Sequence, residues 1–338
     1  MADSQPFVVS LSVWSYRGTD FKKHQRVDSF LAGCFPELSR VTIQDWIKSG
    51  EVQVDEKSVK PSFAVQGGEQ VYIDATFLQV TDAVAQESHL EVVYEDDDLL
   101  VINKPVGLVV HPGAGNPDHT LLNYLLAYRI EQKELPRAGL VHRLDSGTSG
   151  LLMVAKHQFS YNILQQLIKD REVKRDYIAL VEGMPISGDT IDMPIGRDPK
   201  NRLRMRTYKM GAAPSKARNA VTHFRVKEKF STHGLLDVSL ETGRTHQIRT
   251  HLQTLGFPIV GDGFYGWHRK LPLDANDELR DAIRSFSHPA LHAASLSFIY
   301  KPNVGGEKAA RSISLQAEMP SDMAKLVRLL RDNRDSDK

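Results

Sequence analysis

Cysteine is almost absent from this chain, because Cys34 is the only one in 338 residues. A single cysteine excludes an internal disulfide and a cysteine-rich metal site. Long apolar runs are absent too, and none approaches the roughly 20 residues that a membrane-spanning helix requires. Residues 1–4 contain no basic residue, and the apolar run from Phe7 to Trp14 is interrupted by Ser10 and Ser12. This is a poor secretory signal and a plausible strand. We therefore expect a cytoplasmic protein with no membrane partner.

An excess of one charge is also missing, since 43 Lys and Arg residues face 42 Asp and Glu residues, a net charge of +1. This balance argues against a uniformly basic nucleic-acid binder, but not against a local basic segment. Residues 197–229 form such a segment, with eleven Lys or Arg residues, two acids and a net charge of +9. Arg202, Arg204 and Arg206 alternate within it. A strand would place these three arginines on one face, where they could follow the phosphates of RNA.

Several common catalytic motifs are not present. No Gly-Lys-Ser/Thr completes a phosphate-binding loop, no Gly-x-Gly-x-x-Gly opens a helix after a strand, and no serine lies in a nucleophile elbow. His288 and His292 stand four residues apart without an acidic third ligand nearby, and His246 and His251 stand five apart. The sequence therefore predicts no metal site.

Two helices and a small sheet are predicted near the N-terminus. Apolar residues recur at helical spacing over residues 27–35 and 43–47, and Pro36 ends the first helix. Strand-like segments follow at 52–54 and 70–73. This arrangement, within about fifty residues, resembles the S4 RNA-binding module.

The resemblance to the S4 module implies that basic residues near the second helix, here Arg40 and Lys48, contact RNA phosphates. Residues 22–75 hold seven Lys or Arg residues and eight Asp or Glu residues, so the module carries no net positive charge. Its usual Asn-Gly-Lys turn is replaced by Asp55-Glu56-Lys57.

Residues 139–156 contain the main candidate for a reactive group, Asp145. Two short apolar runs flank a polar, glycine-containing loop, which predicts strand, loop and strand. Asp145 lies where the first run ends, beside His142 and Arg143. Taken alone, an aspartate in such a loop more often bonds to its own backbone amides than takes part in chemistry. A catalytic role for Asp145 therefore requires partner residues from other segments of the chain.

Two later segments provide such partners. Residues 174–183 alternate as a strand and place Tyr177 on one face. A strand over 235–241 leads to a helix for which Thr245 is the expected N-cap. The expected inward residues of that helix are Ile248, Leu252 and Leu255. The residues expected around its N-terminus, a favourable place for anions, are Arg244, His246 and Arg249.

Four co-linear motifs give the chain a resemblance to the RluA family of RNA pseudouridine synthases, nearest to the RluD-type enzymes of large-subunit rRNA. The central motif is His142-Arg143-Leu144-Asp145, followed by Thr148-Ser149-Gly150-Leu151. The others are Asn103-Lys104-Pro105 with Val109–Gly115, Arg175-Asp176-Tyr177 with 178–181, and Thr242-Gly243-Arg244-Thr245-His246-Gln247-Ile248-Arg249. The resemblance implies an α+β catalytic domain with a mixed, largely antiparallel sheet and a central cleft.

The same resemblance implies roles for individual residues. Asp145 would be the catalytic aspartate, Tyr177 the tyrosine against the target base, and Arg249 the arginine paired with Asp145. Arg143 matches the residue that enters the RNA when the uridine is flipped out. The expected RNA-binding residues are Arg143, His142, Arg244, Arg202, Arg204, Arg206, Arg40 and Lys48.

The implied domain order has five parts. They are an N-terminal extension (1–21), an S4-like RNA-binding domain (22–76), a linker (77–89), a pseudouridine synthase domain (90–320), and a C-terminal helix with a frayed tail (321–338). The resemblance favours 23S rRNA or the large ribosomal subunit as the partner, and it suggests a monomer.

Pseudouridine formation breaks the N1–C1′ bond of uridine and joins C5 to C1′ without net redox change, so no cofactor is expected. One ionised carboxylate must act as nucleophile or as base, and the sequence leaves both open. Because a bidentate arginine opposes the protonation of a buried aspartate, Arg249 is expected to keep Asp145 charged. A lone acid also argues against a glycosidase, which normally needs two carboxylates.

Two other hypotheses are retained. The basic segment and the S4-like domain also suit a non-catalytic RNA-binding or ribosome-assembly protein, although such a protein has no need of Asp145, Tyr177 and Arg249 together. A metal-dependent hydrolase that uses the histidines is a remote alternative.

Overall fold

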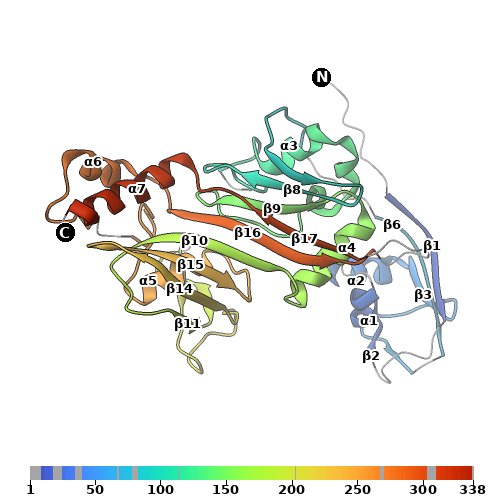
Figure 1. Cartoon of the computed structure of the whole chain (residues 1–338). Coiled ribbons are helices and arrows are strands. Elements are labelled where there is room, and N and C mark those ends of the chain that lie inside the picture. The colour runs from blue at the N-terminus through green and yellow to red at the C-terminus, as the bar shows by residue number, and fades with distance from the viewer. Residues whose placement is uncertain are drawn as a thin grey trace. The chain divides into compact units, whose positions relative to one another are not determined.

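The computed structural model describes nine segments of the chain. They are residues 9–17, 25–34, 40–66, 68–77, 83–113, 115–201, 203–266, 270–302 and 310–336. Contacts divide the chain into two units, Met1–Asp82 with Lys133–Pro136, and Ala83–Gln132 with Arg137–Lys338. We call them the small unit and the large unit, and Figure 1 labels their elements. Among the described residues, no helix has both the length and the apolarity needed to cross a membrane.

The small unit contains two helices and a four-stranded antiparallel sheet of order β1-β6-β3-β4. Its helices and sheet strands are α1 (Val27–Cys34), α2 (Arg40–Ser49), β1 (Val9–Arg17), β3 (Val52–Val54), β4 (Lys57–Ser58) and β6 (Gln70–Phe77). A separate pair joins β2 (Gln25–Arg26) to β5 (Ala64–Val65). The predicted helices and the strands at 52–54 and 70–73 are confirmed.

The core of the small unit contains the apolar residues from which the two helices were predicted. Val27 and Leu31 of α1, Ile43 and Ile47 of α2, and Ile73 of β6 are all at most 1% exposed and belong to one cluster. Each side chain of this size contributes about 1.5–3 kcal/mol when it is fully buried. The two helices therefore depend on this shared core more than on their own short lengths.

The segment 1–21, predicted as an extension without a role, contains β1. This strand pairs with β6 from Val9 opposite Phe77 to Arg17 opposite Gln70. The strand expected over residues 7–14 is thereby confirmed from Val9 onward and continues to Arg17, while residues 7 and 8 lie outside the described residues.

A buried carboxylate ties α1 to α2. Asp28, in the first turn of α1, is completely buried and accepts two hydrogen bonds each from Arg26 and Arg40, and one from Gln44. Burial alone would raise the pKa of Asp28, but these hydrogen bonds hold it far below its usual value. The ionised carboxylate also lies favourably at a helix N-terminus.

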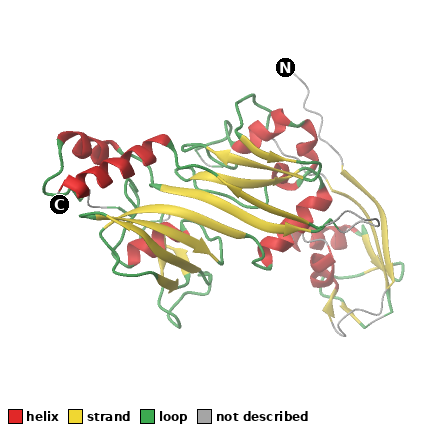
Figure 2. Ribbon diagram, in the orientation of Figure 1, coloured by secondary structure: helices red, strands yellow, loops and turns green. Residues whose placement is uncertain are grey.

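A nine-stranded sheet is the framework of the large unit (Figure 2). Its path is β11-β14-β15-β10-β16-β9-β8-β7, with β17 beside β16, and every pair is antiparallel except β9 with β16. The strands are β7 (Val92–Glu95), β8 (Leu99–Lys104), β9 (Ser149–Ala155), β10 (Lys174–Glu182), β11 (Asp189–Asp192), β14 (Val221–Lys229), β15 (His233–Leu240), β16 (Leu291–Tyr300) and β17 (Arg311–Gln316). A separate hairpin joins β12 (Ile195–Arg197) to β13 (Met205–Thr207). The predicted α+β fold with a mixed, largely antiparallel sheet is confirmed.

Both faces of the sheet carry apolar side chains. On β8, Leu100 and Ile102 belong to the main cluster, whereas Leu99 and Val101 belong to a second cluster. This is the alternation that a strand produces when both of its faces are covered. The helices of the unit are α3 (Leu121–Tyr128), α4 (Gln158–Lys169), α5 (Gln247–Thr254), α6 (Asp277–Ser285) and α7 (Ser321–Ser336).

The C-terminal helix α7 belongs to the large unit and packs against α6 (Figure 1). Met323 and Leu330 are buried in the main cluster. Near its end, Arg331 and Arg334 both donate hydrogen bonds to Glu228 of β14. The predicted frayed tail is therefore wrong as far as Ser336.

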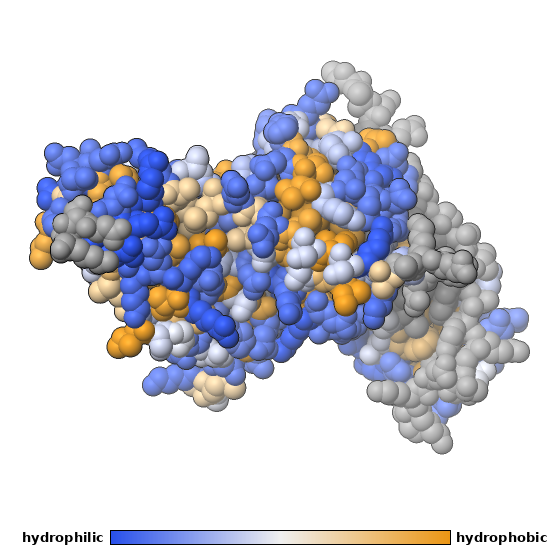
Figure 3. Space-filling model, in the orientation of Figure 1, coloured by the Kyte–Doolittle hydropathy of each residue, from blue (hydrophilic) through white to orange (hydrophobic). Residues whose placement is uncertain are grey.

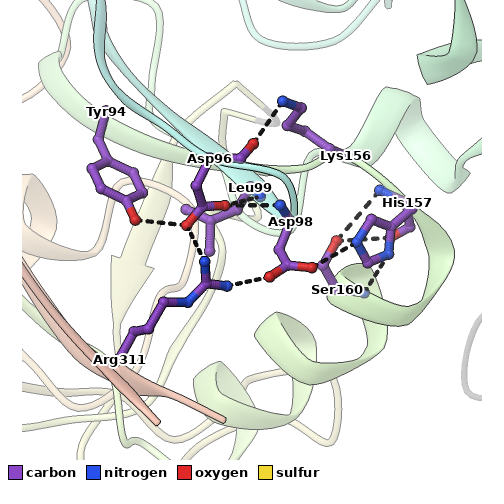
Figure 4. Close-up of polar contacts among 8 residues, drawn as sticks. All are labelled: Tyr94, Asp96, Asp98, Leu99, Lys156, His157, Ser160 and Arg311. Atoms are coloured by element: carbon purple, nitrogen blue, oxygen red, sulfur yellow. Dashed lines mark hydrogen bonds and ion pairs between the residues drawn. The ribbon is translucent and has the colours of Figure 1, made fainter. Parts of the chain in front are cut away.

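A polar cluster fastens β17 to the turn between β7 and β8 (Figure 4). Arg311 donates to Asp96 (2.8 Å) and to Asp98, so that one guanidinium serves two carboxylates. Asp96 also accepts from the Tyr94 hydroxyl and two backbone N–H groups, and Asp98 is bonded to His157. Every carboxylate in this cluster has several partners, which is the arrangement of a structural site.

Candidate active site

Asp145 lies in the loop that leads into β9. The Thr148 N–H donates to the Asp145 carbonyl (3.0 Å) and closes the loop. Gly150 has a φ of 112°, and a Cβ there would lie 2.3 Å from the Ala293 carbonyl oxygen, so the close approach of β16 requires glycine. The predicted strand after the loop is confirmed. The predicted strand before it is wrong, because Leu140 makes only an isolated bridge to β9.

Arg249 on α5 lies between two carboxylates. Its Nη1 donates to Asp145 Oδ2 (3.1 Å), whereas Nε and Nη2 donate to the two oxygens of Asp262 (2.6 and 2.9 Å). The arginine is thus bidentate towards Asp262 and makes a single hydrogen bond to Asp145, where a bidentate pairing was expected. Burial would lower the pKa of Arg249, but Asp262 and, to a smaller extent, Asp145 raise it above its ordinary value.

Asp262 was missed in the sequence because it lies in an irregular turn without periodicity. It is fully buried, and it also accepts hydrogen bonds from the Phe264 and Tyr265 N–H groups (3.0 and 3.2 Å). The rings of Phe264 and Tyr265 lie 5.7 and 5.1 Å from the Arg249 guanidinium. The sequence feature that could have indicated Asp262 is its position between two glycines, followed by two aromatic residues.

Tyr177 reaches the same cleft from the central strand β10. It is 6% exposed, and the strand places it with Ala179 and Val181 in the main cluster, as the alternation predicted. Burial raises the pKa of Tyr177; the positive charge of Arg175 opposes this shift and the negative charge of Asp145 adds to it. The phenol is therefore protonated at neutral pH.

A cleft of about 540 Å³ brings most of the predicted site together. Asp145, Tyr177 and Arg249 all line it, and Arg143 and Arg244 line it with exposed side chains. The carboxylate of Asp145 is 15% exposed. A larger groove of about 1110 Å³ is lined by Asp176, Tyr177 and Ile178 of the same strand, but Asp145 is not part of it.

His142 lines the cleft and also makes a structural contact, while its predicted role in RNA binding stays a prediction. Its Nε2 accepts the N–H of Met153 in β9 (3.0 Å), so the ring supports the loop from behind. Burial, with Arg175 nearby, lowers the pKa of His142 to about 3. A neutral imidazole that accepts a backbone hydrogen bond offers no cation to a phosphate.

The start of α5 differs from the expectation in two respects. The N-cap is His246 rather than Thr245, and its φ of 55° lies in the left-handed region. Leu255, expected to face inward, is 37% exposed, whereas Ile248 and Leu252 are buried as predicted. The helix ends at Thr254, so Leu255 follows it and no longer shares its apolar face.

Lys104 holds the loop that carries Asp145. No individual role was predicted for this residue from the sequence. Its ammonium group is fully buried and donates to the carbonyl oxygens of Pro105, Leu108 and Ser146 (2.7–3.1 Å). It thereby joins the loop after β8 to the residue that follows Asp145. Burial lowers the pKa of Lys104 to about 7, although the charge of Asp145 opposes this shift.

The arginine row of the basic segment is not a continuous strand face. Only Met205–Thr207 is a strand, Arg204 precedes it, and Arg202 lies outside the described residues. Arg204 lies over the ring of Tyr265 (5.2 Å) and Arg206 over that of Tyr208 (5.3 Å). The predicted common face was wrong because the strand is too short to hold the whole row.

Arg40 and Lys48 lie on α2 of the small unit. Arg40 is half-exposed and bonded to Asp28 in the arrangement described above, so part of its function is structural. Lys48 is exposed and pairs with Asp45 one helical turn away (3.0 Å). Both positions leave polar surface for RNA, and no contact in the structure tests that role.

The sheet, the cleft and the carboxylate–arginine pair at its wall are the features of an RNA pseudouridine synthase. The family model described as RNA pseudouridylate synthase matches residues 98–254, and the model described as S4 domain matches residues 25–71. The ribosomal large subunit pseudouridine synthase D of Xanthomonas campestris pv. campestris is 45% identical over 309 residues, which cover 91% of this chain and 90% of that protein. The protein of the same name from Escherichia coli O6:H1 is 43% identical over 308 residues, 91% of each chain.

The solved structures agree with this assignment. Human RNA pseudouridylate synthase domain containing 4 superposes with a TM-score of 0.54 at 25% identity, covering 71% of this chain and 93% of that one. The chain belongs to the RNA pseudouridine synthase family. It is an isomerase that acts on RNA, with an S4 domain ahead of its catalytic domain.

Proposed function

We propose that this enzyme isomerises uridines of 23S rRNA in the large ribosomal subunit and that Asp145 is its catalytic carboxylate. The geometry of Asp145 carries the assignment of the site. Its Oδ2 is held by Arg249, while its Oδ1 accepts no hydrogen bond from the part of the chain that the structure describes. The name of the relatives that are 43 and 45% identical supports the rRNA substrate.

The residues around Asp145 suit the reaction. Arg249, fixed by Asp262, donates a hydrogen bond to Asp145 Oδ2 and limits the rotation of this carboxylate. Tyr177 offers a neutral aromatic side chain to the flipped uracil. Stacking of a base on an aromatic side chain contributes about 1–3 kcal/mol, which is comparable to the few kcal/mol that flipping costs.

Basic residues outside the carboxylate site provide the RNA contacts in this proposal. Arg143 and Arg244 are exposed at the cleft, and Arg143 is the residue that would take the place of the flipped base. Arg206, which is exposed on β13, and Arg204 extend the positive charge along the basic segment. Such charges attract RNA mainly through its phosphates and make binding sensitive to salt.

The cellular setting follows from the proposed substrate. We place the reaction in the cytoplasm, where large ribosomal subunits are present, and we expect a monomer that works without a cofactor. Light scattering of the purified protein checks the monomer.

Mapping of pseudouridine in cellular RNA tests the proposal. Cells that lack this gene are supplied with the wild-type chain or with Asp145→Asn. We expect specific uridines of 23S rRNA to be modified only with the wild-type chain. Modification that persists with Asp145→Asn would remove Asp145 from its role, and wild-type-dependent sites confined to tRNA would remove the 23S substrate.

A further inference from the structure

His246 adopts a backbone conformation that is unusual for histidine. Its φ of 55° and ψ of 23° are left-handed, a region that disfavours residues with a Cβ. Such strain persists where the surrounding structure imposes it, often at functional sites. Here the backbone places the imidazole at the wall of the cleft, with Nε2 at 3.9 Å from Asp145 Oδ2 and the side chain 17% exposed.

The ring of His246 is held from behind by Tyr265. The two rings meet edge to face, with centroids 5.6 Å apart and an interplanar angle of 83°. The Tyr265 hydroxyl lies 2.8 Å from His246 Nδ1. The same hydroxyl oxygen accepts the backbone N–H of Met205, also at 2.8 Å.

These two hydrogen bonds favour one tautomer of His246. Since the Tyr265 oxygen already accepts from Met205, its own proton is available for His246 Nδ1, which then acts as the acceptor. We therefore assign the proton of the neutral imidazole to Nε2, the nitrogen that faces the cleft.

The imidazole is neutral at physiological pH. Burial lowers the pKa of His246; the charge of Asp145 opposes this shift, and the neighbouring Arg249 adds to it. His246 consequently presents a fixed, uncharged N–H donor beside the carboxylate. The gap of 3.9 Å to Asp145 is too long for a direct hydrogen bond and leaves both groups available to the same substrate.

We infer that His246 is a catalytic hydrogen-bond donor whose Nε2–H contacts the uracil while it is detached from the ribose. The inference rests on the proposed role of Asp145. When the N1–C1′ bond breaks, both bonding electrons remain on the uracil, and its carbonyl oxygens share the negative charge. This holds whether Asp145 acts as nucleophile or as base.

The charge on the uracil disappears when C5 bonds to C1′. The C5 proton is then released and N1 takes up a proton, so that the product has the same atoms as uridine. His246 keeps its proton throughout, so the isomerisation remains balanced without any other reactant. A preorganised donor that meets charge as it develops lowers the barrier more than it strengthens ground-state binding. The inference therefore predicts a defect in kcat and little change in KM.

Histidine nitrogen NMR of the full-length protein tests the tautomer directly. In protein labelled with 15N-histidine, we expect the His246 Nδ1 shift to be that of a nitrogen without a proton and Nε2 to be bonded to one. The signal is assigned by its loss in His246→Asn. A proton on Nδ1 would overturn the inference.

Steady-state kinetics test the role of the donor. His246→Asn suits the left-handed backbone, so it folds, but its shorter amide does not reach the position of Nε2. We expect its kcat to fall about 10²-fold with KM changed less than about threefold. His246→Gln places an amide N–H near that position and should regain most of the lost kcat. Tyr265→Phe, which frees the tautomer, should fall between the wild type and His246→Asn.

His119→Asn is the matched control, since His119 also has a positive φ (53°) but does not line the cleft. We expect it to have the kcat of the wild type. If Asp145→Asn is inactive while His246→Asn keeps the wild-type kcat, only the role of His246 fails. If Asp145→Asn is active, the proposed site itself fails.

Discussion

The large unit contains two arrangements in which one arginine lies between two aspartates, and they differ in how completely the carboxylates are satisfied. Arg311 joins Asp96 and Asp98, both of which have further partners from side chains or backbone (Figure 4). Arg249 joins Asp262 and Asp145. Asp262 resembles the first pair, because it accepts four hydrogen bonds and is fully buried.

Asp145 is the exception among these four aspartates. It has one side-chain hydrogen bond from the described residues and faces a cleft. Charge pairing alone therefore does not mark a functional site, since both arrangements have it. In the proposed site the reacting carboxylate is the one whose arginine is fixed by another acid, and its second oxygen accepts no hydrogen bond from the described residues.

The surface of the large unit is mixed in hydropathy. Figure 3 shows hydrophilic and hydrophobic residues interspersed over the face of the large unit turned to the viewer. The hydrophilic side chains around the cleft include the exposed Arg143 and Arg244. Asp96, Asp98 and Arg311 line neither of the two cavities described above.

Among the residues that support the two clusters without reacting, the largest effect is expected from Asp262→Asn. This change leaves Arg249 with one charged partner and breaks a buried ion pair, so the free energy of unfolding should fall by about 3 kcal/mol. Because Arg249 is then free to turn towards Asp145, kcat should fall about 10²-fold. Urea unfolding and single-turnover kinetics measure the two effects.

Asp237→Asn is the matched control for Asp262→Asn, because Asp237 forms an exposed pair with Lys227. It should change stability by less than about 1 kcal/mol and leave kcat unchanged. Wild-type kcat in Asp262→Asn would show that Asp262 does not position Arg249.

A smaller effect, confined to stability, is expected from Arg311→Met. Asp96 and Asp98 lose their shared counter-charge, but the site is partly exposed, so the free energy of unfolding should fall by only about 2 kcal/mol. Activity per folded molecule should stay within about twofold of the wild type. A loss of kcat like that of Asp262→Asn would contradict the distinction between the two clusters.

The smallest effect is expected from Asp28→Asn in the small unit, and it depends on pH. The folded-state pKa of Asp28 lies below its unfolded value near 3.8, so its stabilisation is complete above that value and is lost as pH falls below it. At pH 7 the variant should be less stable by about 1.5 kcal/mol. The difference should shrink between pH 4 and pH 2.

Fluorescence of Trp46, which is buried in the small unit, reports the Asp28→Asn unfolding. Asp45→Asn, on the exposed surface of α2, should show neither the loss at pH 7 nor the change with pH. A difference that is constant with pH would show that the charge of Asp28 is not responsible.

Local patterns were sufficient for most elements, whereas the central site residues were predicted from the resemblance of four motifs to a known family. Helical and strand periodicity predicted α1, α2, α7 and β10, because burial of one face repeats every few residues. Asp145, Tyr177 and Arg249 lie in continuous motifs, so each was visible from its neighbours in the chain. The structure adds that these three residues line one cleft.

The features that sequence patterns missed depend on contacts between distant segments. The pairing of β1 with β6 joins distant segments, and the role of Asp262 depends on a guanidinium on α5. His142 reads as a basic residue beside Asp145, but its burial and its bond to Met153 also give it a structural contact. Periodicity carries no information on such partners.

The most direct test of the central claim compares two aspartates in one assay. Release of tritium from C5-labelled uridine in 23S rRNA transcripts is measured for Asp145→Asn and Asp98→Asn. Both change an aspartate bonded to an arginine into its neutral isostere. We predict that Asp145→Asn lowers the rate at least about 10⁴-fold with unchanged RNA binding, as expected for a reacting group. Asp98→Asn should lose stability and keep its rate per folded molecule; release by Asp145→Asn at the wild-type rate would contradict the account.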